Sequence, residues 1–177
     1  MELITQYIEL LLKVNKRISL TRVADFHTWF ISHVEDSVKA YRVFEGLKAE
    51  YFIDSGSGNG LPGVIFAILS GKPFILCDVD ARKCEFLKTA CYRLKLPGKV
   101  YCGPIEDLAN TQEDRCCFVY RGLGPDHFLV NQYNLTPQSG HFRFISADQE
   151  SLFKGSRVEE YKLSDGSSRF LEISPIK

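Results

Sequence analysis

A glycine-rich segment between two apolar runs is the part of the sequence best suited to chemistry. Asp54 is followed by alternating glycines in Gly56–Gly60, with apolar runs at 51–53 and 64–69. This order predicts a strand, a tight turn and a helix, with glycines where the backbone must turn sharply and approach a ligand. The dinucleotide pattern Gly-x-Gly-x-x-Gly fails, because its third glycine falls on Leu61. We therefore expect a different nucleotide-type cofactor; the alternative is an ordinary tight turn that binds nothing.

The spacing Gly-x-Gly-x-Gly directly after an acid resembles the first motif of S-adenosylmethionine-dependent methyltransferases of Rossmann-like fold, which implies S-adenosylmethionine as the cofactor. In open parallel sheets, ligands bind beyond the carboxyl ends of the strands. Asp78 ends the next predicted strand, where an acid accepts hydrogen bonds from a ribose, and Ile105 and Glu106 follow the third strand, beside the adenine. The alternatives are a turn or capping role for Asp78 and a simple first-turn preference for Glu106. The expected cofactor-binding residues so far are Asp54, Gly56, Gly58, Gly60, Asp78, Ile105 and Glu106.

The apolar patterns along the chain predict an α/β fold in a single methyltransferase domain, residues 1–177. Two helices, at 2–14 and from a capping Asp25 to Gly46, form an N-terminal extension over residues 1–48. Strand and helix patterns then alternate from 49 to 177, which predicts a Rossmann-like, mostly parallel sheet of seven strands that ends in an antiparallel hairpin. The expected strands are 51–54, 73–78, 99–102, 116–120, 142–145, 157–163 and 168–174, with helices at 62–71, 80–94 and 125–135.

Composition limits the possible environments of the protein. The 177 residues carry a formal net charge of +0, whereas many nucleic-acid-binding proteins are basic overall. The apolar runs are too short to cross a membrane, and the N-terminus lacks the features of a secretion signal. The six cysteines form no Cys-x-x-Cys pair or zinc-spaced cluster, so we expect reduced, mostly buried thiols and no metal site. We therefore expect a cytoplasmic monomer.

Basic residues near the N-terminus are the candidate nucleic-acid contacts. Lys13, Lys16, Arg17 and Arg22 lie close together with few acidic residues between them, and Arg82 follows the second predicted strand. Phosphates of an RNA backbone would pair with such side chains. The alternative is an ordinary solvated surface.

Several ordered motifs resemble the bacterial family once called glucose-inhibited division protein B. Its members methylate N7 of a guanine in 16S ribosomal RNA. The resemblance therefore implies S-adenosylmethionine as the cofactor and ribosomal RNA or the small ribosomal subunit as the partner. It places binding positions at Gly56, Leu61, Ile105, Glu106 and Arg121, with Arg121 at the mouth shared by cofactor and substrate. The matching segments are Ser19–Arg22, His33–Ser37, Asp54–Gly63, Arg82–Leu87, Gly103–Glu106 and Arg121.

The implied chemistry needs little from the protein beyond positioning. Guanine N7 has a free lone pair, so proximity and orientation can supply roughly 7–11 kcal/mol of the barrier reduction without a general base. We assign no certain catalytic residue; Arg121 is the candidate for positioning. His33 and Ser37 share a face of the second helix with Asp36 beside them. This helix either borders the cofactor or RNA entrance, or uses these residues to dock on the sheet.

Departures from the family pattern leave two alternatives open. Pro104 stands where the family has arginine, and Tyr120 and Gly122 replace small residues around the central arginine. The family usually has Lys-Gly after the fifth strand, where this chain has Ser146 and Ala147. A lost basic residue there would weaken contacts to RNA. The alternatives are a methyltransferase of the same fold with another substrate, and a non-catalytic protein that binds RNA or the ribosome.

Overall fold

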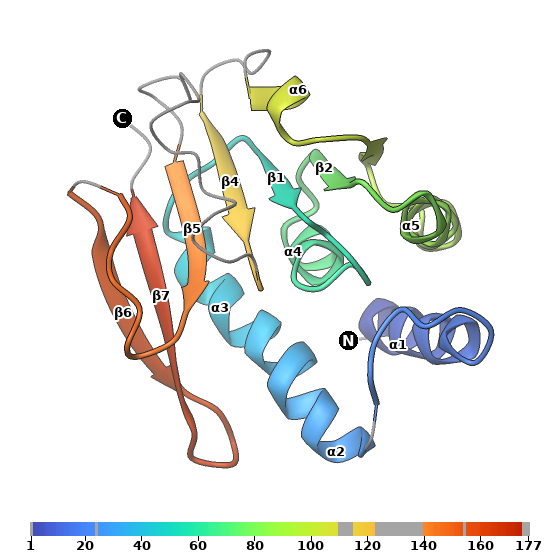
Figure 1. Cartoon of the computed structure of the whole chain (residues 1–177), viewed down its shortest axis with the longest axis horizontal. Coiled ribbons are helices and arrows are strands. Elements are labelled where there is room, and N and C mark those ends of the chain that lie inside the picture. The colour runs from blue at the N-terminus through green and yellow to red at the C-terminus, as the bar shows by residue number, and fades with distance from the viewer. Residues whose placement is uncertain (1, 24, 110–114, 123–139, 154, 175–177) are drawn as a thin grey trace.

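A seven-stranded mixed sheet forms the centre of the computed structural model, which describes residues 2–23, 25–109, 115–122, 140–153 and 155–174 (Figure 1). The strand order is β3-β2-β1-β4-β5-β7-β6, and the first five strands in the chain run parallel. The last two form an antiparallel hairpin, with β7 paired to β5. The strands are β1 (Tyr51–Ser55), β2 (Phe74–Asp78), β3 (Gly98–Cys102), β4 (Cys116–Tyr120), β5 (Gly140–Ile145), β6 (Arg157–Lys162) and β7 (Ser168–Ser174).

Helices from the first 94 residues pack against one face of this sheet. The large apolar cluster there joins Tyr7, Phe44, Phe66 and Leu87 from helices to alternate strand residues such as Phe52. In Figure 1, α1 lies beside α5, far from it in sequence. The helical segments are α1 (Glu2–Asn15), α2 (Phe26–Trp29), the π-helix η1 (Phe30–Glu35), α3 (Asp36–Glu45), α4 (Gly63–Ser70), α5 (Ala81–Leu94) and α6 (Glu106–Ala109).

The opposite face of the sheet carries a smaller cluster. Ile53, Cys77 and Phe118 lie at its centre, and Ile105 packs against it. Five of the six cysteines are buried and all are free; Cys102 is exposed. None of the helices among the described residues is long and apolar enough to cross a membrane.

The order and type of the predicted elements are confirmed wherever the chain is described, and their ends differ by two residues at most. Asp25 caps the second helical segment by accepting a hydrogen bond of 2.7 Å from the backbone N–H of Thr28. Asp80 caps α5 in the same way, with the N–H of Arg82 at 2.9 Å. The helix predicted at 125–135 lies outside the described residues.

One predicted helix differs in its interior. The segment from Asp25 to Gly46 is continuous, but a six-residue π-helix, η1, interrupts it between α2 and α3. Arg121 at the end of β4 donates to the carbonyl oxygens of Ser32 and His33 in this segment, at 2.5 and 3.2 Å. A π-turn widens the helix and frees carbonyl groups for such partners. The partner is far away in the sequence, so local periodicity does not reveal the interruption.

Candidate functional site

The glycine-rich loop lies at the carboxyl end of β1 and folds back against β2. The backbone N–H of Ser57 donates to the carbonyl of Cys77 at 2.9 Å, and its hydroxyl donates to the carbonyl of Asp54 at 2.8 Å. Gly58 has a φ of 58°, in the left-handed region that favours glycine. A Cβ placed on Gly58 would meet only one carbonyl oxygen, at 3.7 Å. The outer side of the loop is therefore open, as a backbone that binds a ligand requires.

Asp78 lies directly against this loop. Its Oδ2 accepts a hydrogen bond of 2.7 Å from the N–H of Gly58, and its Oδ1 accepts one of 2.9 Å from the N–H of Asp80. The backbone carbonyl of Asp78 also accepts from the N–H of Gly103, the residue after β3. The turn role offered as an alternative is thus present, and the carboxylate joins the glycine-rich loop to the turn before α5 at the edge where the sequence predicts the ribose.

Asp54 supports the loop from behind. Its side chain is buried, and Oδ2 accepts a hydrogen bond of 3.1 Å from the N–H of Gly63, the first residue of α4. A Cβ on Gly63 would lie 2.4 Å from that oxygen, so only glycine permits this approach. Burial raises the pKa of Asp54 to about 7, against the opposing effect of hydrogen bonds from Ser57 and Gly63.

Tyr7 of α1 contacts the loop from the N-terminal extension. Its hydroxyl donates to the carbonyl oxygen of Asn59. Gly60 follows with a φ of 91°, and a Cβ on it would lie 2.8 Å from the Tyr7 hydroxyl. Burial, followed by the charge of Asp54, raises the pKa of Tyr7 well above its usual value, so the phenol is a neutral donor. The sequence predicted only a helix at 2–14 here and did not reveal this contact.

The remaining predicted cofactor positions differ in exposure. Glu106 is exposed in the first turn of α6, while Ile105 is half-buried against the smaller apolar cluster. Both follow β3 at the same edge of the sheet as the glycine-rich loop. Leu61 is buried in the larger cluster, and its N–H donates to the side chain of Asn59 at 3.2 Å. Leu61 therefore stabilises the loop from inside the core.

Arg121 is the centre of a half-buried polar cluster at the carboxyl end of β4. Its guanidinium forms a 2.9 Å ion pair with Asp36 and donates to the hydroxyl of Ser37 at 3.2 Å, in addition to the two π-helix carbonyls. The group also lies over the ring of Phe144, 5.1 Å from its centroid. The side chain is only 17% exposed, so Arg121 is not an ordinary surface arginine. The docking role proposed for the helix residues is confirmed.

Electrostatics fix the charges in this cluster. Burial raises the pKa of Asp36, against the opposing effects of Arg121 and of a hydrogen bond from the Tyr161 hydroxyl. Burial, and then the positive charges of Arg121 and Arg169, lower the pKa of His33 to about 4. At neutral pH His33 is therefore uncharged. Arg121 and Asp36 form an ion pair, whereas Arg169 forms no ion pair with a described carboxylate.

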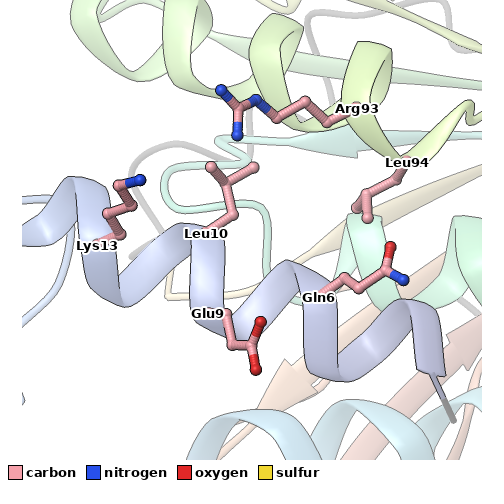
Figure 2. A pocket seen from close by; sticks show the side chains of 6 residues that line it. All are labelled: Gln6, Glu9, Leu10, Lys13, Arg93 and Leu94. Carbon is pink, nitrogen blue, oxygen red and sulfur yellow. The ribbon is translucent and has the colours of Figure 1, made fainter.

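The candidate RNA contacts are all exposed. Arg82 pairs with Asp80 at 2.9 Å. Within the described part of the chain, no ion pair is formed by the other four candidates, Lys13, Lys16, Arg17 and Arg22. Lys13 and Leu10 of α1 and Arg93 of α5 line a groove of about 440 Å³ between the two helices (Figure 2). The sequence did not single out Arg93, because only the packing of α1 on α5 brings it to Lys13.

Solved structures of known proteins share this architecture. A methyltransferase from Geobacter sulfurreducens matches with a TM-score of 0.65 and 13% identity, over 96% of this chain and 88% of that one. The human methyltransferase 10 domain containing protein matches with a TM-score of 0.60 and 13% identity, over 80% and 81% of the two chains. The predicted Rossmann-like fold of the class I methyltransferases is thereby confirmed.

Sequence comparison then identifies the family. The chain belongs to the GidB family, because the model described as rRNA small subunit methyltransferase G matches residues 1–160. The ribosomal RNA small subunit methyltransferase G of Cereibacter sphaeroides is 30% identical over 163 residues, 85% of this chain and 79% of that protein. Its counterpart in Photobacterium profundum is 37% identical over 141 residues, which are 77% of this chain and 66% of that protein. Membership implies a methyl donor and a ribosomal RNA substrate.

Proposed function

We propose that this chain transfers a methyl group from S-adenosylmethionine to N7 of a guanine in 16S ribosomal RNA. The observation that carries the proposal is the open glycine-rich loop held by Asp78, at the edge of the sheet where ligands of this fold bind. Membership of the GidB family supports ribosomal RNA as the acceptor. The particular base and atom rest on the family resemblance. The cytoplasmic location and the monomeric state stay predictions from the sequence.

The residues at the edge of the sheet fit this cofactor. Gly56 and Gly58 offer backbone to a ligand, whereas Gly60 packs against Tyr7 and holds the loop from within. Asp78 keeps acceptor capacity for ribose hydroxyls beyond its two backbone donors. We propose that Ile105 and Glu106 contact the adenine after β3. Asp54 and Leu61 hold the loop from within the core, so we propose that they act by positioning it. Arg121 has the same role on the acceptor side.

The reaction requires orientation rather than proton transfer. S-adenosylmethionine supplies an activated methyl group, and guanine N7 attacks with a lone pair that carries no proton. The neutral His33 and the compensated pair of Arg121 and Asp36 give the edge of β4 a fixed arrangement of charges. We propose that this rigid edge holds the acceptor in line with the donor, which is the main source of catalysis.

The basic residues around the end of α1 supply the contacts to RNA in this proposal. Lys13, Lys16, Arg17 and Arg22 belong to a segment that connects two parts of the site. Tyr7 joins α1 to the glycine-rich loop, and Arg121 joins η1 to the sheet. RNA phosphates along this segment, with Arg82 nearby on α5, would position the substrate next to the loop.

The test compares 16S ribosomal RNA from cells with and without the protein. Mass spectrometry of nuclease fragments should show one N7-methylguanosine that disappears without the gene and returns when the wild-type chain is expressed. Gly58→Val should fail to restore it, because a branched side chain would enter the open side of the loop where the cofactor binds. Gly46→Ala is the matched control, because Gly46 has an ordinary helical φ of −64°.

Unchanged methylation without the gene would contradict the proposal. Methyl transfer by the purified chain to a different acceptor would then favour the hypothesis that the chain is a methyltransferase with another substrate. RNA binding without any methyl transfer or cofactor binding would instead favour the non-catalytic reading.

A further inference from the structure

An open hollow lies beside the glycine-rich loop, on the other side of β4. Its volume is about 410 Å³, and it is formed where β4 and β5 end and β7 begins. The register brings these ends together, because Tyr120 pairs with Arg143 and Ile145 pairs with Phe170. The polar cluster around Arg121 forms one side of the hollow. It therefore occupies the same edge of the sheet as the predicted cofactor site, one strand away.

Arg169 provides the hollow with a cation that forms no ion pair with a described carboxylate. Its guanidinium donates to the hydroxyl of Ser167 at 3.2 Å and to the carbonyl of Ser168 at 3.0 Å. Arg121, its neighbour, is already paired with Asp36. The cluster thus keeps one net positive charge at a half-buried position, which favours an anionic ligand.

The other walls of the hollow suit a nucleotide. Phe144 and Phe170 provide apolar surface on neighbouring strands. Ser146 and Gln149 follow β5, and the side-chain oxygen of Gln149 accepts the N–H of Ser146 at 2.9 Å. The hollow therefore combines apolar walls with amide and hydroxyl groups and a guanidinium, the groups that proteins use for bases and phosphates.

Arg169 also accounts for a departure in the sequence. The family resemblance places a lysine where this chain has Ser146, and that loss removes a positive charge after β5. Ser146 and Arg169 line the same hollow from adjacent strands. A cation from β7 thus stands beside the position where the cation after β5 is missing.

We infer that this hollow receives the methyl-accepting nucleotide of the RNA, with the Arg169 guanidinium bound to a phosphate of that nucleotide or its neighbour. The inference rests on the proposed function and specifies the acceptor side of the same site. Arg169 is a specificity residue in this account: it binds the substrate and takes no part in bond formation. The planar guanidinium can donate two parallel hydrogen bonds to one phosphate.

The test uses Arg169→Met, Arg169→Lys and a matched control, Arg157→Met. Arg157 lies on β6 in the same hairpin, but its side chain is 63% exposed and pairs with Glu159. Thermal unfolding confirms that each variant is folded, and calorimetry with S-adenosylhomocysteine measures the cofactor site separately. RNA binding is measured by fluorescence anisotropy with a 16S RNA fragment that contains the target guanine, over a range of salt concentrations.

We expect Arg169→Met to bind S-adenosylhomocysteine like the wild type while its KM for unmethylated small subunits rises about tenfold, the loss of one charge-assisted contact. The slope of log affinity for RNA against log salt should fall in magnitude by about 0.7–0.9, the value for one phosphate. Arg169→Lys should recover the slope and part of the affinity. Arg157→Met should match the wild type in every measurement.

Two results would overturn the inference. One is a KM and a salt slope for Arg169→Met equal to those of a wild type that does methylate RNA; the proposed function would then stand without this pocket. The other is a wild type that binds the RNA fragment with the same affinity and slope as Arg169→Met although it transfers no methyl group, in which case both proposals fail. If the wild type does not transfer methyl but the slope differs as expected, the pocket stands as an RNA site and only the enzymatic proposal fails.

Discussion

Replacing Arg121 by methionine should strongly destabilise the fold. The substitution keeps most of the apolar stem but leaves Asp36, whose side chain is 3% exposed, without its cation. Breaking a buried ion pair by removing one partner typically costs about 3–5 kcal/mol, because an uncompensated charge stays buried. The Arg121 side chain is 17% exposed, so solvent screening reduces this loss of stability only slightly. The loss of donors to the carbonyls of Ser32 and His33 acts in the same direction.

Urea unfolding followed by circular dichroism measures this change, and Asp36→Asn with the double variant completes a mutant cycle. We expect a coupling energy of at least about 2 kcal/mol between the two residues. A coupling near zero, or a loss below about 1 kcal/mol for Arg121→Met, would refute the reasoning that the pair holds the N-terminal helix on the sheet.

The same experiment has a pH dependence of known sign. Burial raises the pKa of Asp36 in the folded state, so the folded protein binds this proton more tightly than the unfolded chain and the associated stability falls as pH rises. Without Arg121 the pKa rises further, since its opposing effect is lost. The deficit of Arg121→Met relative to the wild type should therefore be larger at pH 7 than at pH 4. An equal deficit at both values would contradict this account.

Three further changes test other parts of the structure. Gly60→Ala should lower affinity for S-adenosylhomocysteine in calorimetry by tenfold or more, because φ is 91° and the added Cβ would displace Tyr7 from the loop. Changing Lys13 and Arg93 together to alanine should lower RNA affinity and reduce the salt slope by about 1.4–1.8, the value for two phosphates. Glu172→Gln should cost about 3–5 kcal/mol in urea unfolding, because the fully buried carboxylate pairs with Arg143 at 2.8 Å and the neutral amide leaves that cation uncompensated.

Controls separate these effects from general damage. Arg42→Ala, on the exposed side of α3, should leave the RNA salt slope unchanged. If it lowers the slope as much as the groove pair does, binding follows overall charge and not the groove. For Glu172, hydrogen bonds from Phe153, Ser151 and Ser156 outweigh the effect of burial and lower its pKa. Its contribution is therefore present above the carboxyl's unfolded pKa and is lost on acidification, so the variant should differ less from the wild type at low pH.

Local sequence patterns were enough to predict the edge of the sheet where we place the cofactor. The alternation of glycines after Asp54 and the acid at the end of the next strand depend on short-range backbone geometry, which the sequence encodes directly. The predicted place of Asp78 beside the loop is accordingly found in the structure. The roles of Asp54 and Leu61 were less visible, because spacing alone does not separate a residue that faces a ligand from one that supports the loop from the core.

Contacts between distant segments could not be predicted from local sequence patterns. Tyr7 reads as one more apolar position on a helix, and only the docking of α1 places its hydroxyl at Asn59. The π-helix depends on Arg121, 85 residues beyond Asp36. Arg169 has the pattern of a polar residue in an alternating strand, and its importance follows from its place in the hollow without an ion pair to a described carboxylate.

The hydrogen bond from Tyr161 to Asp36 has a consequence for synthesis of the chain. The two residues are 125 positions apart, so Asp36 leaves the ribosome long before its last partner exists. A chain that stops before β6 therefore lacks the Tyr161 hydroxyl, and Asp36 at the start of α3 can then be buried only at a cost in free energy. The helix is among the first segments made, yet its docking is completed only once the final hairpin has emerged. Premature termination before Tyr161 should thus weaken the docking of the helical segment that carries Asp36, rather than only remove the far edge of the sheet.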